Sequence, residues 1–201
     1  MIKTVIFDLG RVIVPFDFQR AYSRVEFLTG IPAAEVRARI SPTGLVQEFE
    51  SGQLASELFA ARLSALLGLQ TTYREFCELW CSIFFPETLL TDEFVGALKA
   101  NYRLVLLSNT NAIHFDMLLA TYPILRHFDE LILSYKVGAM KPSRMIYDAA
   151  VEAARCMPSE CFFTDDIPEY VEAARAAGID AVQFQNAEQI QRELRARGVR
   201  W

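Results

Sequence analysis

Five short runs of apolar residues recur along the chain, and each is rich in β-branched or aromatic side chains. They are too short and too continuously apolar for strands with one solvent-facing side. Such runs are typical of the central strands of a parallel sheet that is covered on both faces. The expected strands are TVIFD at 4–8, RLVLLSN at 103–109, ELILS at 130–134, CFFTDD at 161–166 and AVQF at 181–184.

Segments with the apolar period of amphipathic helices alternate with these runs. Alternation of strands and helices indicates βαβ units, so we expect an α/β protein whose core is a Rossmann-like, doubly wound parallel sheet. The predicted helices of this core lie at 91–102, 111–122, 143–156, 169–178 and 187–198.

Residues 9–102 separate the first expected strand from the second, and helix-period segments fill most of this gap. A parallel crossover needs only ~12 residues or one helix. We therefore predict an all-helical subdomain at 16–86, inserted into a core of residues 1–15 and 87–201, although its apolar positions could equally extend the main core. Its expected helices lie at 19–30, 32–40, 55–68 and 73–85.

The composition is that of an ordinary globular protein, with 201 residues, 52% hydrophobic residues and a formal net charge of −5. Mild acidity without a Lys/Arg cluster argues against nucleic-acid or anionic-membrane partners. We see no signal peptide and no run of the ~20 apolar residues that a membrane span needs. The four cysteines form no CxxC pair and are expected to be reduced, buried thiols. A cytoplasmic protein is therefore expected, and the oligomeric state is left open.

Polar residues stand at the carboxyl ends of three of the expected strands, at the edge where open α/β sheets bind their ligands. They are Asp8 at the end of the first strand, Ser108 and Asn109 at the end of the second, and Asp165 and Asp166 at the end of the fourth. Lys141 stands before a predicted helix near the same edge. Asp8 could cap a turn, Ser108 could cap a helix, and Lys141 could be a solvated lysine. Adjacent carboxylates after a buried strand, however, destabilise a fold unless a cation or a lysine compensates.

The chemistry that this set of residues favours is phosphoryl transfer. Asp8 can attack phosphorus as a nucleophile and form an acyl phosphate, which divides hydrolysis into two steps. Mg²⁺ held by Asp8, a backbone carbonyl and Asp165 would offset the charge of the phosphate. The Ser108 hydroxyl and the N–H groups of the Leu9–Gly10 turn would hold phosphate oxygens, and Lys141 would stabilise the developing charge.

Four motifs resemble, in order, those of the haloacid dehalogenase-like hydrolase superfamily: FDLGRV, LSNT, MKP and FFTDD. The resemblance covers the whole core, and the insertion stands where that family has a helical cap. It implies that Asp8 is the nucleophile and that Asp165 and the Gly10 carbonyl bind Mg²⁺. It also implies that Asp166 binds the metal through water or orients Lys141, and that Ser108 and Asn109 contact phosphate.

The stretches FDLGRVIV, LSNTNAIH and GAMKPSRMIY look most like the phosphatases of that superfamily that act on α-D-glucose 1-phosphate, and EFESGQLASELF fits their cap. This resemblance implies a small phosphorylated metabolite as the substrate. A rival interpretation is a 2-haloacid dehalogenase, which uses an aspartate nucleophile without a metal. Such enzymes resemble D-x-Y-G-T at the first motif, where this chain has Gly10, and an acidic pair has little use beside a leaving halide.

Gly10 departs from many phosphatases of the superfamily, which have there a second Asp that protonates the leaving oxygen. Such acid–base catalysis is worth ~10²–10⁴-fold. Three explanations stay open. The substrate has a good leaving group, as in a glycosyl or acyl phosphate; another residue serves, with His114, Glu48 or Glu50 as candidates; or the chain is a weak enzyme that acts as a binding or regulatory module. The glucose-1-phosphatase-like subgroup also has Gly here.

Several other side chains have two interpretations. His114 is expected at the surface or in a helix cap rather than in catalysis, and His127 is expected to be structural. Arg11 either meets an anionic substrate or is a solvated loop residue, and Tyr170 stands where Asn is common in the family, in the helix that supports Asp165. Most of Phe16, Phe18, Phe49 and Trp80 should pack the helices. A cap that opens and closes predicts hinges near 14–18 and 85–90.

Overall fold

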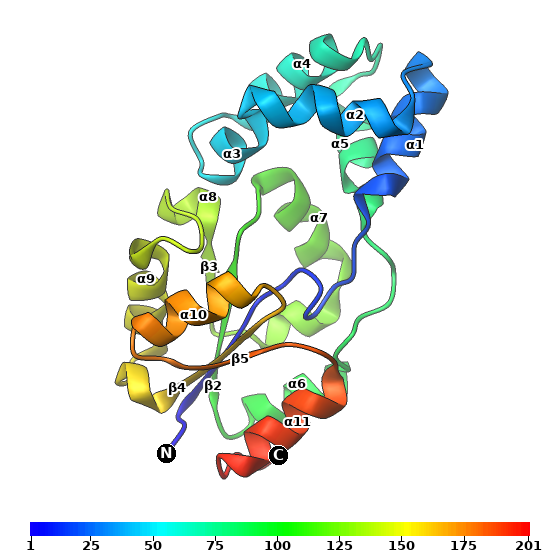
Figure 1. The fold of residues 1–201 in the computed structure, drawn as a ribbon. Coiled ribbons are helices and arrows are strands. Elements are labelled where there is room, and N and C mark those ends of the chain that lie inside the picture. The colour runs from blue at the N-terminus through cyan, green and yellow to red at the C-terminus, as the bar shows by residue number, and fades with distance from the viewer.

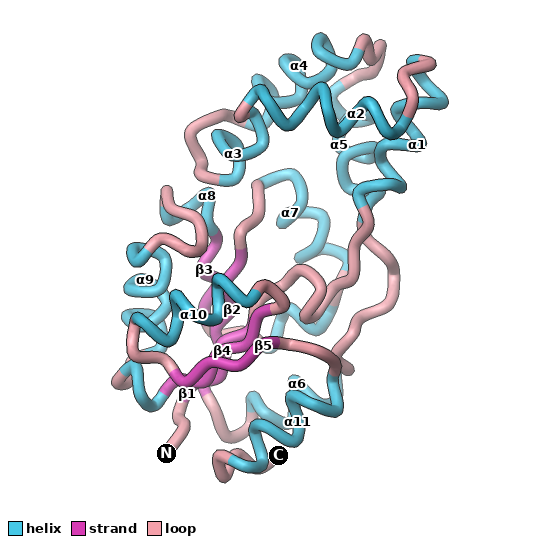
Figure 2. Tube along the Cα trace, viewed as in Figure 1, coloured by secondary structure: helices cyan, strands magenta, loops and turns pink.

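The five expected strands form one parallel sheet in the computed structural model, which describes residues 1–201. The strand order is β3-β2-β1-β4-β5, so the strand that precedes Asp8 lies at the centre (Figure 2). Each strand begins and ends within two residues of the expected bounds. The strands are β1 (Thr4–Phe7), β2 (Arg103–Ser108), β3 (Glu130–Leu133), β4 (Cys161–Asp165) and β5 (Asp180–Gln183).

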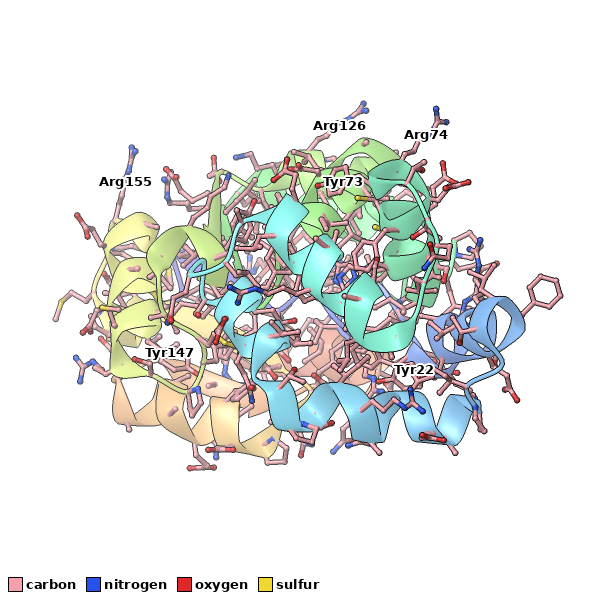
Figure 3. The ribbon with its side chains drawn as sticks, turned by 90° about the horizontal axis from the view of Figure 1, so that it is seen from above. Tyr22, Tyr73, Arg74, Arg126, Tyr147 and Arg155 are labelled. Carbon is pink, nitrogen blue, oxygen red and sulfur yellow. The ribbon has the colours of Figure 1, made fainter.

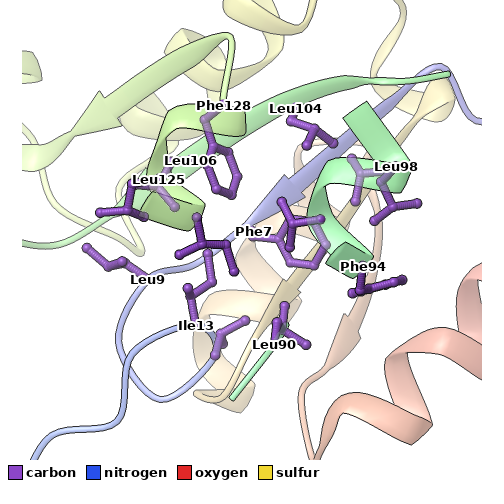
Figure 4. Close-up of a cluster of buried hydrophobic side chains, with 14 of the residues drawn as sticks. Phe7, Leu9, Ile13, Leu90, Phe94, Leu98, Leu104, Leu106, Leu125 and Phe128 are labelled. Atoms are coloured by element: carbon purple, nitrogen blue, oxygen red, sulfur yellow. The ribbon is translucent and has the colours of Figure 1, made fainter. Parts of the chain in front are cut away.

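Both faces of the sheet are buried, which explains the continuously apolar runs. Side chains alternate between the faces of a strand, so Phe7 of β1 joins one hydrophobic cluster and Ile6 joins another. Figure 4 shows the first cluster, where Phe7 packs among leucines and lies edge-on to Phe128, with ring centroids 6.2 Å apart. The Rossmann-like α/β prediction is confirmed.

Helices cover each face of the sheet. The face that includes Phe7 is covered by α6 (Asp92–Lys99), α7 (Ala112–Thr121) and α11 (Ala187–Ala196). The opposite face is covered by α9 (Arg144–Ala154) and α10 (Pro168–Ala176). A short helix, α8 (Ser134–Val137), follows β3 and was not expected from the sequence. None of the helices has the length and apolar character that crossing a bilayer requires.

Residues 16–86, which lie between β1 and α6, form helices joined by short loops, with an isolated β-bridge between Phe16 and Phe84 at the two ends of the stretch. We refer to this stretch as the helical insertion. Its buried side chains form a third hydrophobic cluster, which Ile113 of α7 also joins. In Figure 1 the insertion lies over the end of the sheet at which β1 and β2 finish. The exact division into core and cap at these boundaries stays a prediction. The helices of the insertion are α1 (Phe18–Thr29), α2 (Ala33–Ile40), α3 (Leu45–Glu50), α4 (Ser56–Leu67) and α5 (Tyr73–Trp80).

Two connections join the insertion to the core, and they run side by side. Asp17 N donates to the Ile83 carbonyl at 2.9 Å, and Phe85 N donates to the Pro15 carbonyl at 3.1 Å. These connections fall in the segments where hinges were expected, and hinge motion stays a prediction.

A second contact lies at the other end of the insertion, where Gly52 meets the backbone of Tyr135 in α8. A Cβ atom at Gly52 would overlap the Tyr135 carbonyl oxygen, so only glycine allows this approach. Gly52 also has φ +75°, a conformation that side chains disfavour. The insertion is therefore held against the core at both of its ends.

Candidate active site

Lys141 joins the ends of β1 and β4. Its Nζ donates to Asp8 Oδ1 and to Asp165 Oδ2, at 2.6 Å each, and to the Leu107 carbonyl at 3.1 Å. All three charged side chains are buried. A buried charge is tolerated only when it is paired, so these groups form one electrostatic unit.

Burial is the largest single influence on the pKa of each charged group in this site, and the charges of the neighbouring groups add to or oppose it. Burial raises the pKa of Asp8 to about 7, the Lys141 ammonium opposes this rise, and Asp165 adds to it. Burial alone would lower the pKa of Lys141, but the two carboxylates outweigh burial and raise it. The pKa of Asp166 is raised by burial and by Asp165, whereas Arg11 lowers it. One ammonium does not balance three carboxylates.

Asp8, Asp165 and Asp166 have the donor set of a hard divalent cation. Each offers a carboxylate oxygen, and these oxygens lie within 4.8 Å of one another. Ile167 N donates to Asp165 Oδ1 at 2.9 Å and so fixes the orientation of that carboxylate. Mg²⁺ prefers such oxygen ligands, and its charge would correct the imbalance. The residues therefore fit the expected metal, whereas the ligand role of the Gly10 carbonyl stays a prediction.

A tight loop follows Asp8 and closes back on itself. The Leu9 carbonyl accepts hydrogen bonds from Ile13 N and Val14 N, and Arg11 N donates to the Val14 carbonyl, at 2.9 Å each. A Cβ atom at Gly10 would lie 2.7 Å from the Phe16 ring. The ring thus occupies the space in which an acid–base carboxylate at position 10 would begin.

Asn109 supports Lys141 through the main chain. Its Oδ1 accepts from Lys141 N at 2.7 Å, and its Nδ2 donates to the Lys141 carbonyl at 3.0 Å. Sequence reasoning missed this role, because nothing local signals a pairing between two distant loops. The expected phosphate contact of Asn109 stays a prediction. Ser108 is buried at the end of β2, and its Oγ makes only a long hydrogen bond of 3.4 Å to the Asn109 carbonyl.

Tyr170 also supports Lys141. The Lys141 ammonium lies 5.2 Å from the centre of the Tyr170 ring, and the Tyr170 hydroxyl accepts from Asn109 Nδ2 at 3.4 Å. Asp165 receives its support from the main chain of Ile167 instead. Ser134, which the sequence did not single out, ties the next loop in place, because its hydroxyl donates to the Thr110 carbonyl and accepts from Thr110 N, at 2.9 Å each.

His114 lies inside the molecule, so the expectation of a surface position is wrong. Its Nε2 donates to the Trp80 carbonyl at 3.1 Å, and its ring stacks on the Trp80 ring with centroids 5.2 Å apart. Burial lowers the pKa of His114 to about 4. The residue therefore links α7 to the insertion, with the N-cap Asn111 accepting from its main-chain N–H at 3.0 Å. His127 pairs with Asp92 at 3.1 Å on α6, which agrees with a structural role.

A cavity of about 610 Å³ lies between the insertion and the core. Phe49 and Trp80 are both buried in the hydrophobic cluster of the insertion, where Phe49 stacks on Phe59 at 4.2 Å. Trp80 also lines the cavity, as does Phe18, which is partly exposed. Tyr22 of α1 also lines it, and Figure 3, which looks down on the insertion, labels this residue. The full lining is Arg11, Phe18, Tyr22, Arg37, Ile40, Ser41, Gly44, Val46, Gln47, Glu50, Trp80 and Met140.

A parallel sheet whose central strand delivers a buried aspartate to a lysine and an acidic pair defines a class of hydrolase. The model of the haloacid dehalogenase-like hydrolase family matches residues 2–178. The chain belongs to this family, as its four motifs predicted.

Several known proteins are similar to the chain over most of its length. It is 30% identical over 201 residues to D-ribitol-5-phosphate phosphatase of Bacteroides thetaiotaomicron, covering 96% of this chain and 97% of that protein. It is 30% identical over 190 residues to Phosphatase MT3486 of Mycobacterium tuberculosis, covering 90% and 86%. A haloacid dehalogenase family enzyme of B. thetaiotaomicron, solved with magnesium and inorganic phosphate, has the same fold, with a TM-score of 0.84, 23% identity and coverage of 93% and 96%.

Proposed function

We propose that the chain is a Mg²⁺-dependent phosphatase that hydrolyses a small sugar or polyol phosphate through an aspartyl-phosphate on Asp8. The observation that supports it most directly is the buried Asp8–Lys141–Asp165 unit, with both ion pairs at 2.6 Å. The phosphatase activity of two relatives and the magnesium and phosphate bound to a neighbour of the same fold also favour it.

In the proposed mechanism Asp8 attacks phosphorus, and the bond from phosphorus to the ester oxygen breaks. The ester oxygen takes up a proton and leaves as an alcohol. A water molecule then attacks the aspartyl phosphate, which releases inorganic phosphate and restores Asp8. Mg²⁺, held by Asp8, Asp165 and the Gly10 carbonyl with Asp166 beside them, would supply positive charge against the phosphate oxygens.

Lys141 orients Asp8 in this mechanism and stabilises the charge that develops on phosphate. The Ser108 hydroxyl, the N–H groups of Leu9 and Gly10 and the Asn109 amide are proposed phosphate contacts. The helical insertion acts as a cap that shields the reaction from bulk water, and the organic part of the substrate occupies the cavity of about 610 Å³. Its hinges are proposed at 14–18 and 85–90.

We propose that neither position 10 nor His114 supplies the proton for the leaving oxygen. Gly10 has no side chain, and a Cβ atom there would lie 2.7 Å from the Phe16 ring. His114 is buried, and burial lowers its pKa to about 4. Glu48 pairs with Arg62 at 3.8 Å and lines a different groove. A glycosyl phosphate has a good leaving group and has little need of a strong acid, whereas a polyol phosphate such as D-ribitol 5-phosphate has a poorer leaving group and needs one more. The relative rates on the two substrates therefore report how much acid catalysis the site supplies.

The test is a phosphatase assay with D-ribitol 5-phosphate, α-D-glucose 1-phosphate and p-nitrophenyl phosphate. We expect activity with Mg²⁺, none in chelator, and a loss of kcat of at least about 10³-fold in Asp8→Asn, because the nucleophile is removed. Asp148→Asn, in an exposed i,i+4 pair with Arg144 on α9, is the control and should keep wild-type activity.

Phosphate release that persists in Asp8→Asn would exclude the covalent mechanism. Halide release from 2-chloropropionate in the presence of chelator would establish the dehalogenase alternative instead. A wild-type protein that is folded and inactive on all of these substrates would favour a binding or regulatory module.

A further inference from the structure

Three charged side chains that line the cavity between insertion and core form no hydrogen bond and no ion pair with the protein. Glu50 and Arg37 come from the insertion, and Arg11 comes from the loop after Asp8. None of their side chains makes a hydrogen bond or an ion pair in the structure, although other charged residues of the insertion, such as Glu35 and Arg39, are paired. Charged groups that face a shared cavity unpaired are available to a ligand.

Glu50 is the least expected of these groups. It ends α3, is half-buried, and burial alone raises the pKa of its carboxyl to about 7. A carboxyl that loses water without gaining a donor destabilises the folded protein. A ligand that supplies hydrogen-bond donors would remove this cost, and a shifted carboxyl in a cleft is typical of functional sites.

Arg11 provides an independent observation on the core side of the cavity. Its φ is 57°, in the left-handed region, which costs a residue with a side chain roughly 1–2 kcal/mol. Its guanidinium lies 4.8 Å from the centre of the Phe16 ring, which holds it beside Gly10. Strain of this kind gathers at functional sites, where the surrounding structure enforces it.

The composition of the lining discriminates between chemical classes of ligand. A hydroxyl both donates and accepts hydrogen bonds, so it can serve a carboxylate and a guanidinium together. A second phosphate or carboxylate on the substrate could pair with Arg11 and Arg37, but it only accepts hydrogen bonds, so it would repel the Glu50 carboxylate and leave it without a donor. An unsubstituted alkyl or aryl group would leave all three charged groups unpaired. The aromatic rings of Tyr22 and Trp80 offer apolar surface to a carbon chain.

We propose that Glu50 and Arg11 determine specificity by binding hydroxyl groups of a polyhydroxylated leaving group, Glu50 as acceptor and Arg11 as donor. This inference rests on the proposed phosphatase function and adds the class of ester that is preferred. In this proposal, the loop after the nucleophile forms one side of the recognition site and α3 forms the other.

The test compares kcat/KM for D-ribitol 5-phosphate with kcat/KM for p-nitrophenyl phosphate, which has no hydroxyl groups on its leaving group. We expect the ratio of the two to fall at least about tenfold in Glu50→Gln and in Arg11→Gly, since hydrogen bonds to charged groups are among the stronger ones. The ratio is independent of the folded fraction, because both substrates sample the same enzyme.

Matched controls exist for both variants. Glu48 lies on the same helix as Glu50 but pairs with Arg62, so Glu48→Gln is the control for Glu50→Gln. Arg155 is the other arginine with positive φ, at 56°, so Arg155→Gly is the control for Arg11→Gly. Arg155 points outward at the edge of the molecule (Figure 3). Both controls should keep the wild-type ratio.

The possible outcomes separate this inference from the proposed function. An active wild-type enzyme whose ratio is unchanged by Glu50→Gln and Arg11→Gly would overturn the inference alone, as would equal losses on both substrates. An enzyme that hydrolyses p-nitrophenyl phosphate and neither D-ribitol 5-phosphate nor α-D-glucose 1-phosphate would also overturn it. Inactivity on every phosphate ester would overturn the proposed function itself.

Discussion

Gly10 shows how one residue limits the chemistry of the site. The Phe16 ring lies where its side chain would begin, and Phe16 is itself packed against Phe18 and Phe84, with ring centroids 5.3 and 6.1 Å away. An acid at this position therefore requires more than a change of residue 10. The packing of Phe16 thus favours glycine at position 10, and glycine in turn leaves the site without an acid–base carboxylate there.

We predict that Gly10→Asp gives no gain in kcat and lowers the free energy of unfolding by ~1–3 kcal/mol, since the new side chain overpacks the Phe16 site. Urea denaturation and a phosphatase assay measure both effects. The double variant Gly10→Asp with Phe16→Ala provides the control, and the two changes should be less destabilising together than the sum of their separate effects. A single variant that is as stable as the wild type and more active would contradict the packing argument.

Among the elements of secondary structure, the sequence patterns predicted most accurately those whose residues are buried. The strands were predicted closely because both faces of the sheet are covered, so every strand is an apolar run. The helices α3 and α8 were missed. Each is short, with four or six residues, and a helix of that length depends on tertiary contacts rather than on its own pattern.

The site residues divide in the same way. The positions of Asp8 and Asp165 follow from the ends of strands, so sequence alone brings them to one edge of the sheet. The pairing of Asn109 with the main chain of Lys141 joins two loops, and the presence of Glu50 and Arg11 in the lining of one cavity depends on the position of α3. Neither contact has a local signal, so neither could be predicted.

The contact between α3 and α8 gives a prediction about whole elements. Gly52→Ala should separate them, because its Cβ would overlap the Tyr135 carbonyl. Gly68→Ala is the matched control: its φ is +68° and nothing lies within 4 Å of the added Cβ. Both variants place alanine in a left-handed conformation, which costs roughly 1–2 kcal/mol. The additional loss of unfolding free energy in Gly52→Ala, compared with Gly68→Ala, therefore measures the effect of the overlap.

We expect this additional loss to be ~1–3 kcal/mol in the free energy of unfolding, by analogy with other overpacked sites. Gly52→Ala should also raise KM for a sugar phosphate, because α3 ends at Glu50 and lines the cavity. Thermal or urea unfolding and steady-state kinetics measure the two effects. Equal behaviour of the two variants would show that the α3–α8 contact is not important for either property.

At the scale of the molecule, the insertion and the core are joined through a buried imidazole. His114 of α7 donates to the Trp80 carbonyl at the end of α5 and accepts from Asn111 Nδ2 at 3.1 Å. The Cys81 thiol, next along the chain from Trp80, donates to the Ile113 carbonyl at 3.5 Å. The four cysteines are free, as expected, so no disulfide assists this junction.

The junction should make stability depend on pH, and the sign follows from the pKa. The pKa of His114 is about 4 in the folded protein, against 6.5 ordinarily, because burial disfavours the imidazolium. Between these values the unfolded chain binds a proton that the folded protein does not. His114 therefore leaves stability unaffected above pH 6.5 and reduces it as the pH falls towards 4, by up to about 3 kcal/mol.

His114→Gln keeps an amide that can donate to the Trp80 carbonyl but does not titrate. Between pH 7 and pH 4.5, the free energy of unfolding of the variant should fall by about 2–3 kcal/mol less than that of the wild type, as measured by urea denaturation at each pH. Comparing the two proteins removes the contribution of the carboxylates, which titrate in both. The same acid sensitivity in both proteins would mean that His114 can become charged inside the fold, and the junction between insertion and core would then have to open without global unfolding.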